Sequence, residues 1–268
     1  MHQFTPTPSL RFAVPPSLGP ETSEARAPLL ERFLSHSLGK PVLVDVARNY
    51  EALASELLSG RAEAGWAPPF VCARLEAMGV RILARGVRRG RSSYRSALVC
   101  RADSRFSLEN LQGASAAWVD RDSVGGYLLA LAFLKAKGLV PAKVFSAQQF
   151  HGSYQAALQA VAAGKADVAA VFAPPDAAGE ETGISELLPE RAGEFRVLAF
   201  TPEVPNDGVA LSMDLSPQLS SALETALLSL HSSDEGRAVL HDGFSVERFE
   251  PAPRMGYRAL YRVALASL

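Results

Sequence analysis

The sequence has little of what marks several classes of protein. Its 268 residues include only two cysteines, Cys72 and Cys100, which are too few for a disulfide framework. Both cysteines lie in apolar stretches, so we expect buried, inert thiols. The sequence contains no cluster of Cys and His, no Walker loop and no His-Glu-x-x-His or Gly-x-Ser-x-Gly motif. It therefore predicts no metal site, no cofactor and no covalent catalysis.

An excess of charge and long apolar runs are also missing. The chain carries 27 Lys and Arg against 28 Asp and Glu, a formal net charge of −1, so nothing favours nucleic acid as a partner. No window approaches the roughly 18 apolar residues that a membrane span needs, and we expect no membrane insertion. The first residues, MHQFTPTPS, lack the basic and apolar regions of a secretory signal. We therefore expect a cytoplasmic protein, or a periplasmic one if a signal has been removed.

What the sequence does contain is a regular alternation of short apolar runs and amphipathic stretches. In the first third, strands are expected at residues 10–14, 42–46, 62–66 and 80–84, with helices at 21–37, 50–58 and 68–78. A second set has strands at residues 93–101, 114–119, 144–147 and 167–172 and helices at 107–111, 127–137 and 153–163. Strands at 195–201 and 209–213 precede helices at 217–230, 234–240 and 254–265. This alternation is typical of an α/β protein with mostly parallel sheets and flanking helices.

The two sets predict two lobes, because 268 residues exceed most single cores and fit two lobes of roughly 100–150 residues. We expect lobe I to comprise residues 1–92 and 206–268, and lobe II to comprise residues 93–205. The chain would then cross between the lobes twice, near Ser93 and near Pro205, and the two crossings would form a hinge. Ligands bind to sheets of this kind at the carboxyl ends of the strands.

Four segments carry a resemblance to a known family. They are LLSGRAEAGWAPPFVCARL at residues 57–75, YRSALVCRADSRFSLENLQG at 94–113, VDRDSVGGYLLALAFLKAKGL at 119–139 and HGSYQAALQAVAAGKADVAAV at 151–171. In this order and spacing they resemble the substrate-binding proteins of phosphonate/phosphite/phosphate-type ABC transporters, from Arg11 to about Met213. The resemblance implies a type 2 periplasmic-binding fold with a two-strand hinge. It also implies that a small anionic molecule is bound by lobe closure without turnover, with a transporter or a regulatory protein as partner.

The loop DRDSVGG, residues 120–126, is the main candidate for the ligand site. Ser123, Val124, Gly125 and Gly126 stand at an expected helix start, where free backbone N–H groups and the helix dipole favour an anion. Taken alone, the residues favour a simpler interpretation, in which Ser123 caps the helix and the glycines form a tight turn. The resemblance favours the anion. Val124 and Gly125 stand where the family often has hydroxyl residues, so we expect weaker binding of a tetrahedral oxyanion.

We expect the other ligand-binding residues to come from both lobes and from the crossings: Trp66, Pro69, Phe70, Ser93, Tyr94, Tyr154, Asp176 and Asn206. The resemblance implies that Tyr94 reaches the ligand, and it aligns Tyr154 with a histidine of the family. Core packing is the alternative for the aromatic side chains, and an exposed loop carboxylate is the alternative for Asp176. The arginine-rich stretch at residues 85–91 is expected to be a solvated loop that can steer an anion toward the cleft.

Two other functions stay open. One is an enzyme on the same fold, of the lyase or dehydratase kind, which a cleft serine or carboxylate with a base in reach would favour. The other is a protein-interaction module with a degenerate cleft, which a cleft filled by its own side chains would favour.

Overall fold

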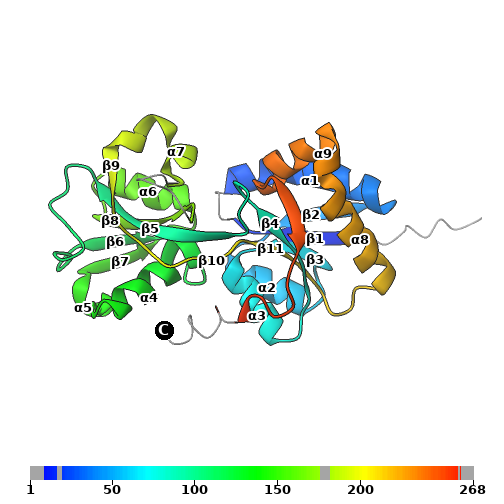
Figure 1. Ribbon diagram of the computed structural model, residues 1–268, viewed down its shortest axis with the longest axis horizontal. Helices are drawn as coiled ribbons and strands as arrows, with labels where there is room; N and C mark the ends of the chain where they lie inside the picture. Colours follow the sequence, from blue (N-terminus) through cyan, green and yellow to red (C-terminus); the bar gives the residue numbers. More distant parts are fainter. Residues whose placement is uncertain (1–8, 17–19, 176–181, 259, 261–268) are drawn as a thin grey trace, which may run out of the picture.

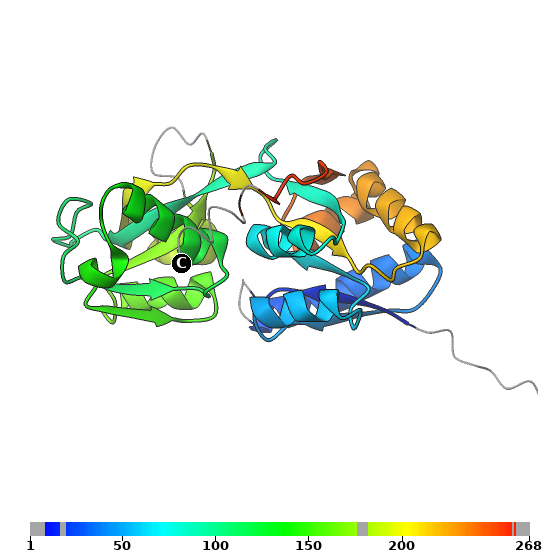
Figure 2. The ribbon, with the colours of Figure 1, turned by 90° about the horizontal axis from the view of Figure 1, so that it is seen from below.

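The computed structural model describes residues 9–16, 20–175, 182–258 and 260. Figures 1 and 2 show two lobes side by side, each built around its own sheet, with extended segments running between them. Lobe I, at the right of Figure 1, is formed by the two ends of the chain, and lobe II is formed by its middle. The predicted two-lobed α/β fold is confirmed.

Lobe I contains a six-stranded sheet covered by helices on both faces. Its strand order is β12 (Arg248–Pro251), β4 (Ile82–Val87), β11 (Gly208–Leu211), β3 (Ala64–Ala67), β1 (Leu10–Val14) and β2 (Val42–Val46). Its helical segments are α1 (Pro20–Leu38), α2 (Tyr50–Leu58), α3 (Pro69–Ala77), α8 (Pro217–Ser229), η3 (Leu230–Ser232), α9 (Asp234–Ala238) and η4 (Val239–Phe244). Successive residues of β1 point to opposite faces, so Ala13 joins the core under α2 and α3 while Phe12 joins the core under α1 and α8.

Lobe II contains the second six-stranded sheet. Its strand order is β10 (Val204–Pro205), β5 (Ser93–Arg101), β8 (Val168–Ala173), β6 (Ser115–Trp118) and β7 (Ala147–Phe150), and β9 (Phe195–Phe200) also pairs with β5. Its helical segments are η1 (Val124–Leu128), α4 (Leu129–Ala136), α5 (Pro141–Val144), α6 (Tyr154–Ala162), α7 (Ile184–Leu187) and η2 (Pro189–Glu194). Leu98 of β5 packs on the α4 side of this sheet, and Val99 packs on the α6 side.

The chain passes between the two sheets twice. The segment from β4 to β5 leads into lobe II, and the segment from β10 to β11 leads back (Figure 1). The two crossings lie side by side, because β10 pairs with the start of β5 and the Asn206 N–H donates to the Ser92 carbonyl at 2.9 Å. Parallel pairing holds within β2–β1–β3 and β7–β6–β8, whereas the returning strand β11 inserts antiparallel between β3 and β4. Each sheet therefore combines parallel and antiparallel pairs, and every antiparallel pair includes β4, β5 or β11, the strands next to the crossings.

Several expected elements differ in the structure. Residues 107–111 form a turn and not a helix, with the Asn110 N–H donating to the Ser107 carbonyl at 3.1 Å. Pro141 opens the short helix α5, because proline fits a first helical turn, and the strand expected at residues 144–147 therefore starts at Ala147. β4 extends to Val87, so part of the arginine-rich stretch is strand. The C-terminal strand β12 was not expected. Half of the helix expected at 254–265 lies outside the described residues, and residues 254–257 form a turn where the helix was expected to start.

Candidate functional site

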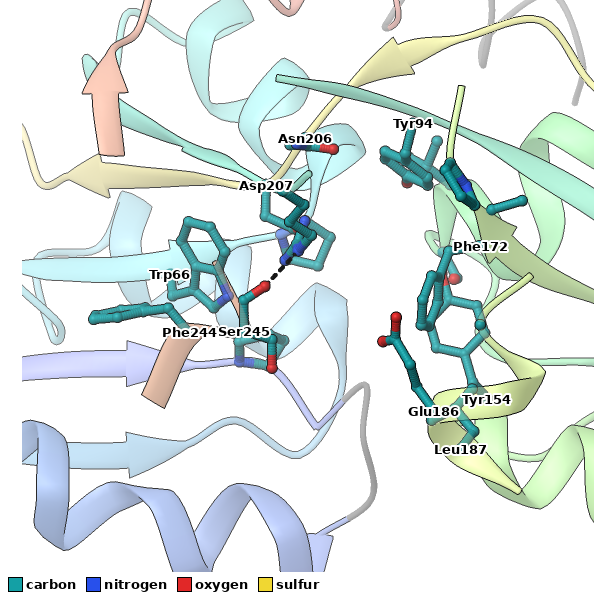
Figure 3. A pocket seen from close by; sticks show the side chains of 18 of the residues that line it. Trp66, Tyr94, Tyr154, Phe172, Glu186, Leu187, Asn206, Asp207, Phe244 and Ser245 are labelled. Atoms are coloured by element: carbon teal, nitrogen blue, oxygen red, sulfur yellow. Dashed lines mark hydrogen bonds and ion pairs between the residues drawn. The ribbon is translucent and has the colours of Figure 1, made fainter. Parts of the chain in front are cut away.

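A cavity of about 390 Å³ lies between the two lobes. Figure 3 shows Trp66, Asp207 and Ser245 of lobe I on one side of this space and Tyr154 and Phe172 of lobe II on the other. Sites for small molecules usually measure roughly 300–1,000 Å³ and combine apolar walls with a few polar groups. The size, position and lining of the cavity therefore fit a small-molecule site that both lobes build.

On the lobe II wall, two tyrosines cover the helix start. A Cβ atom at Gly125 would lie 2.6 Å from Tyr154 Oη and 3.0 Å from Tyr94 Cε2, so the Tyr154 hydroxyl and the Tyr94 ring lie directly against Gly125. Burial raises the pKa of both hydroxyls, and a hydrogen bond with Ser123 opposes part of the rise at Tyr154. Both tyrosines therefore keep their protons at physiological pH and can act only as neutral hydrogen-bonding groups there.

Three backbone donors in the loop and at this helix start have partners within the loop. Ser123 Oγ accepts a hydrogen bond from the Gly126 N–H at 3.1 Å, which is the capping role that the sequence offered as the simpler interpretation. Before the helix, the Asp122 N–H donates to Asp120 Oδ1 at 2.9 Å and the Ser123 N–H donates to the Asp120 carbonyl at 3.1 Å. The loop thus satisfies its own N–H groups at three positions.

On the lobe I wall, two arginines converge on one residue. Arg88 Nε donates to the Ser245 carbonyl at 2.8 Å, and Arg26 Nη1 donates to Ser245 Oγ at 3.0 Å. Arg88 Nη1 also pairs with Asp207 Oδ2 at 2.7 Å, and its guanidinium lies 5.9 Å from the centre of the Trp66 ring. This wall therefore presents charged groups beside an aromatic surface.

Asn206 lies at the crossing, where the two walls meet. Its Nδ2 donates to the carbonyls of Gly86 and Arg91 at 2.9 and 3.0 Å, and its own carbonyl accepts from Tyr257 Oη at 2.6 Å. Oδ1 is buried and has no hydrogen-bond partner among the described residues. The two donor bonds fix the orientation of the amide, so Oδ1 stays a buried acceptor within a residue that lines the cavity.

Two ion pairs join the lobes. Arg74 Nη1 of α3 lies 2.6 Å from Asp122 Oδ2 in the loop before η1, and Arg89 Nη2 lies 3.1 Å from Glu186 Oε1 of α7. Burial raises the pKa of Asp122 despite the opposing effect of Arg74, so the desolvation of this carboxylate outweighs its pairing. The second pair is about half exposed and contributes little energy.

The structure brings these predicted residues to the cavity: Trp66, Ser93, Tyr94, Ser123, Val124, Tyr154 and Asn206. Four others do not line it. Pro68 takes the place expected for Pro69, and Phe70 is buried in the core beneath α3. Gly125 lies behind the two tyrosines and Gly126 lies against Val119, so neither offers its backbone to the cavity. Asp176 lies outside the described residues.

Sequence reasoning missed several lining residues, namely Arg26, Phe172, Glu186, Leu187, Asp207, Phe244 and Ser245, and it placed Arg88 in a solvated loop. Arg88 lies next to the end of β4, and its ion pair with Asp207 is the contact that the sequence could not reveal. The sequence does place arginines at residues 85–91, near the first crossing, and Asp207 near the second. Opposite charges at the two crossings were the signal that could have indicated this ion pair.

The charged residues that line the cavity favour an anion. Within the described ranges they are Arg26, Arg88 and Arg89 against Glu186 and Asp207, a surplus of one guanidinium. No group of three or more His, Cys, Asp and Glu side chains gathers there, or elsewhere in the described part of the chain, to hold a metal ion. Of the helices that the structure describes, none is long and apolar enough to cross a membrane.

The fold and the cavity together define the class of two-lobed binding proteins with the type 2 periplasmic-binding fold. The sequence profile of the family described as "ABC transporter, phosphonate, periplasmic substrate-binding protein" matches residues 12–257. The chain belongs to this family. The description agrees with the periplasmic alternative drawn from the sequence and lends no support to the cytoplasmic one.

Solved structures from several organisms share the fold. A binding-protein component of an ABC phosphonate transporter from Pseudomonas aeruginosa has a TM-score of 0.84 at 20% identity, over 97% of this chain and 86% of that chain. PhnD1 from Prochlorococcus marinus, in complex with methylphosphonate, has a TM-score of 0.83 at 18% identity, over 97% and 99%. XAC2383 from Xanthomonas citri, bound to ATP, has a TM-score of 0.78 at 18% identity, over 97% and 98%. At such identities the likeness establishes the fold.

Proposed function

We propose that this protein binds an organic anion in the cavity between its lobes and presents it, in the periplasm, to the membrane part of a phosphonate-type ABC transporter. One observation carries the proposal: a cavity of about 390 Å³ that both lobes line, with a surplus of one guanidinium among its described residues. The ligands of two structural neighbours, methylphosphonate and ATP, are phosphorus-containing anions of very different size. Both facts favour an anion, but the ligands of the neighbours differ too much in size to indicate the size of this one.

Closure of the lobes is part of this proposal. Residues 1–92 with 206–268 would move as one body and residues 93–205 as the other, about the two crossings at Ser93 and Pro205. The Arg74–Asp122 and Arg89–Glu186 pairs would form on closure and break on opening. A ligand that touches both walls would favour the closed form by its differential affinity for that form.

Thermal unfolding with a panel of anions tests the proposal. The panel comprises inorganic phosphate, methylphosphonate, longer alkyl- and arylphosphonates, sulfonates and carboxylates, after native mass spectrometry of the purified protein for a retained ligand. A ligand at 100 times its Kd stabilises the folded state by about 2.7 kcal/mol, which raises the Tm by about 5–10 °C for a chain of this size.

Glycerol and glucose at the same concentrations serve as uncharged controls. A panel in which no anion raises the Tm more than these controls would contradict the proposed function. The protein-interaction alternative would then be preferred, because it needs no ligand in the cavity.

A further inference from the structure

We infer that the charged head of the ligand binds on lobe I, between Arg26 and Arg88, and that the ligand is an organic anion with an apolar or aromatic body. This inference rests on the proposed function and specifies the ligand class of the same cavity. The sequence had placed the anion at the helix start at Ser123. The site inferred here lies on the opposite wall.

The guanidinium groups of Arg26 and Arg88 converge on Ser245. Both donate to Ser245, one to its hydroxyl and one to its carbonyl, and all three residues line the cavity. Ser245 has φ 53° and ψ 46°, a left-handed conformation that costs a non-glycine residue about 1 kcal/mol or more. Ser245 adopts this conformation as the C-cap of η4, and its hydroxyl and carbonyl there accept hydrogen bonds from the two arginines.

The charge of Arg26 lies close to that of Arg88. Burial lowers the pKa of its guanidinium and the neighbouring Arg88 lowers it further, whereas Asp242 raises it. An arginine stays protonated even so, and the pair therefore carries two like charges close together. Asp207 pairs with Arg88, while the described hydrogen bond of Arg26 goes to a neutral hydroxyl. A planar or tetrahedral anion between the two side chains would relieve this repulsion and accept charge-assisted hydrogen bonds.

The helix start on lobe II is covered by side chains. The Tyr154 hydroxyl and the Tyr94 ring lie against Gly125, and Ser123 Oγ accepts from the Gly126 N–H. An anion at Gly125 would have to displace the buried Tyr154 side chain and the partly buried Tyr94 side chain. Hydrogen bonds from arginine to an anion cost no such rearrangement, so the lobe I wall is the favoured place for the charge.

The remaining walls set the class of the ligand body. Trp66 packs edge-to-face with Phe244 at 5.5 Å on lobe I, and Tyr154 packs edge-to-face with Phe172 at 5.4 Å on lobe II. Figure 3 shows these rings on opposite sides of the cavity, with Leu187 beside Tyr154. A phosphate ion would fill a small part of the volume and leave these surfaces wet. A ring or an alkyl chain attached to the anionic head would cover them and gain hydrophobic energy.

The test compares two probes and three variants by isothermal titration. The probes are phenylphosphonate and methylphosphonate, which share the anionic head and differ in the body. The variants are Arg26→Gln, Arg26→Lys and, as a matched control, Arg81→Gln, whose side chain pairs with Glu224 away from the cavity. We expect wild type to bind phenylphosphonate at least about tenfold more tightly than methylphosphonate. Arg26→Gln should weaken phenylphosphonate binding about 10- to 100-fold, Arg26→Lys should weaken it less, and Arg81→Gln should leave it unchanged.

The crystal structure of the phenylphosphonate complex gives a second measurement that does not depend on how the variants fold. We expect phosphonate oxygens within hydrogen-bond distance of Arg26 and Arg88. Phosphonate oxygens on the Ser123–Gly126 backbone, or equal binding by wild type and Arg26→Gln, would overturn the lobe I site while leaving the proposed function standing. Binding of methylphosphonate as tightly as phenylphosphonate would overturn the ligand class. Failure of wild type to bind any anion would remove the proposed function itself.

Discussion

The two walls of the cavity differ in the polar groups that they carry. On lobe II, the loop before η1 satisfies its own N–H groups, and two protonated tyrosines lie over the helix start. On lobe I, the guanidinium groups of Arg26 and Arg88 are ionised and converge on Ser245, and each has only one or two polar partners among the described residues. The groups around the helix start on lobe II are therefore neutral and covered, whereas two guanidinium groups line the cavity on lobe I.

The proposed lobe I site implies that a family's cleft can be kept while the residues that bind the charged group lie on the opposite wall. The fold still brings a helix start and a crossing-strand tyrosine to the cleft, as the resemblance implied. Val124 and Gly125 provide no hydroxyl there, and Tyr154 Oη lies where a Cβ of residue 125 would be. With the tyrosine hydroxyl against Gly125 and the Ser123 cap on the Gly126 N–H, the described residues of this wall offer an anion only uncharged donors, whereas the other wall offers the guanidinium groups of Arg26 and Arg88.

The largest effect is expected at Asn206, where the two walls meet. Asn206→Asp would remove the donors to the Gly86 and Arg91 carbonyls and would bury a carboxylate beside those two acceptors. We expect a loss of about 3–5 kcal/mol in the free energy of unfolding at neutral pH, measured by urea denaturation. The aspartate would have a raised pKa in the folded state, so folding would favour its protonated form. The deficit should therefore shrink as the pH falls through that raised pKa.

Asn110→Asp is the matched control, since Asn110 lies exposed in a turn, and it should change stability by less than about 0.5 kcal/mol. If the two variants were equally stable, the amide of Asn206 would not be the group that holds the crossings together.

A smaller effect is expected on the lobe II wall. Gly125→Ala places a Cβ 2.6 Å from Tyr154 Oη and 3.0 Å from Tyr94 Cε2, so one of the rings must shift. We expect a loss of about 1–3 kcal/mol from overpacking, measured by denaturation. Gly193→Ala is the control, because a Cβ at Gly193 meets nothing within 4 Å, and it should be neutral or slightly stabilising.

Tyr154→Phe sharpens the same test, because it removes the oxygen that the new Cβ would meet. The double variant should be more stable than the sum of the two single losses predicts, by about 0.5–2 kcal/mol. Strict additivity would mean that Tyr154 Oη is not what occupies the space beside Gly125.

Some of these features can be predicted from the sequence and others cannot. Periodicity and turn residues place most strands and helices within a few residues, because apolar spacing and Gly/Pro positions act locally. The two crossings and the capping role of Ser123 also follow from local signals. The filling of the helix start does not, since Tyr94 and Tyr154 reach Gly125 only through the pairing of β5 with β8 and the position of α6.

The lobe I wall was harder still to predict. Arg26 lies on a long helix near the N-terminus, and Ser245 lies in the C-terminal return, 219 residues away. An arginine on a helix is ordinarily solvated, so nothing near Arg26 in the sequence distinguishes it. Arg88 stands among four arginines, and only its ion pair with Asp207 singles it out. Contacts between the two ends of the chain are the information that a single sequence lacks.

The smallest effect is expected at the ion pair that joins the two walls. Arg74 and Asp122 lie 2.6 Å apart, yet burial raises the pKa of Asp122 more than Arg74 lowers it, and Asp120 and Glu51 raise it further. Since the folded pKa exceeds the unfolded one, the stabilisation from this group is fully present below the unfolded pKa of about 4 and is lost as the pH rises through the folded pKa. Asp122→Asn should therefore change the free energy of unfolding at pH 7 by less than about 1 kcal/mol.

On acidification from pH 7 to the unfolded pKa of about 4, wild type should gain stability relative to Asp122→Asn. Urea denaturation of both proteins at pH 7 and at about pH 4 measures this, with Asp103→Asn as a control because the Asp103 side chain is 80% exposed. A loss of more than about 2 kcal/mol for Asp122→Asn at pH 7, with no relative gain of wild type on acidification, would show that the ion pair outweighs burial. The contact would then be a net attraction between the lobes, and the closed form would be stabilised even without a ligand.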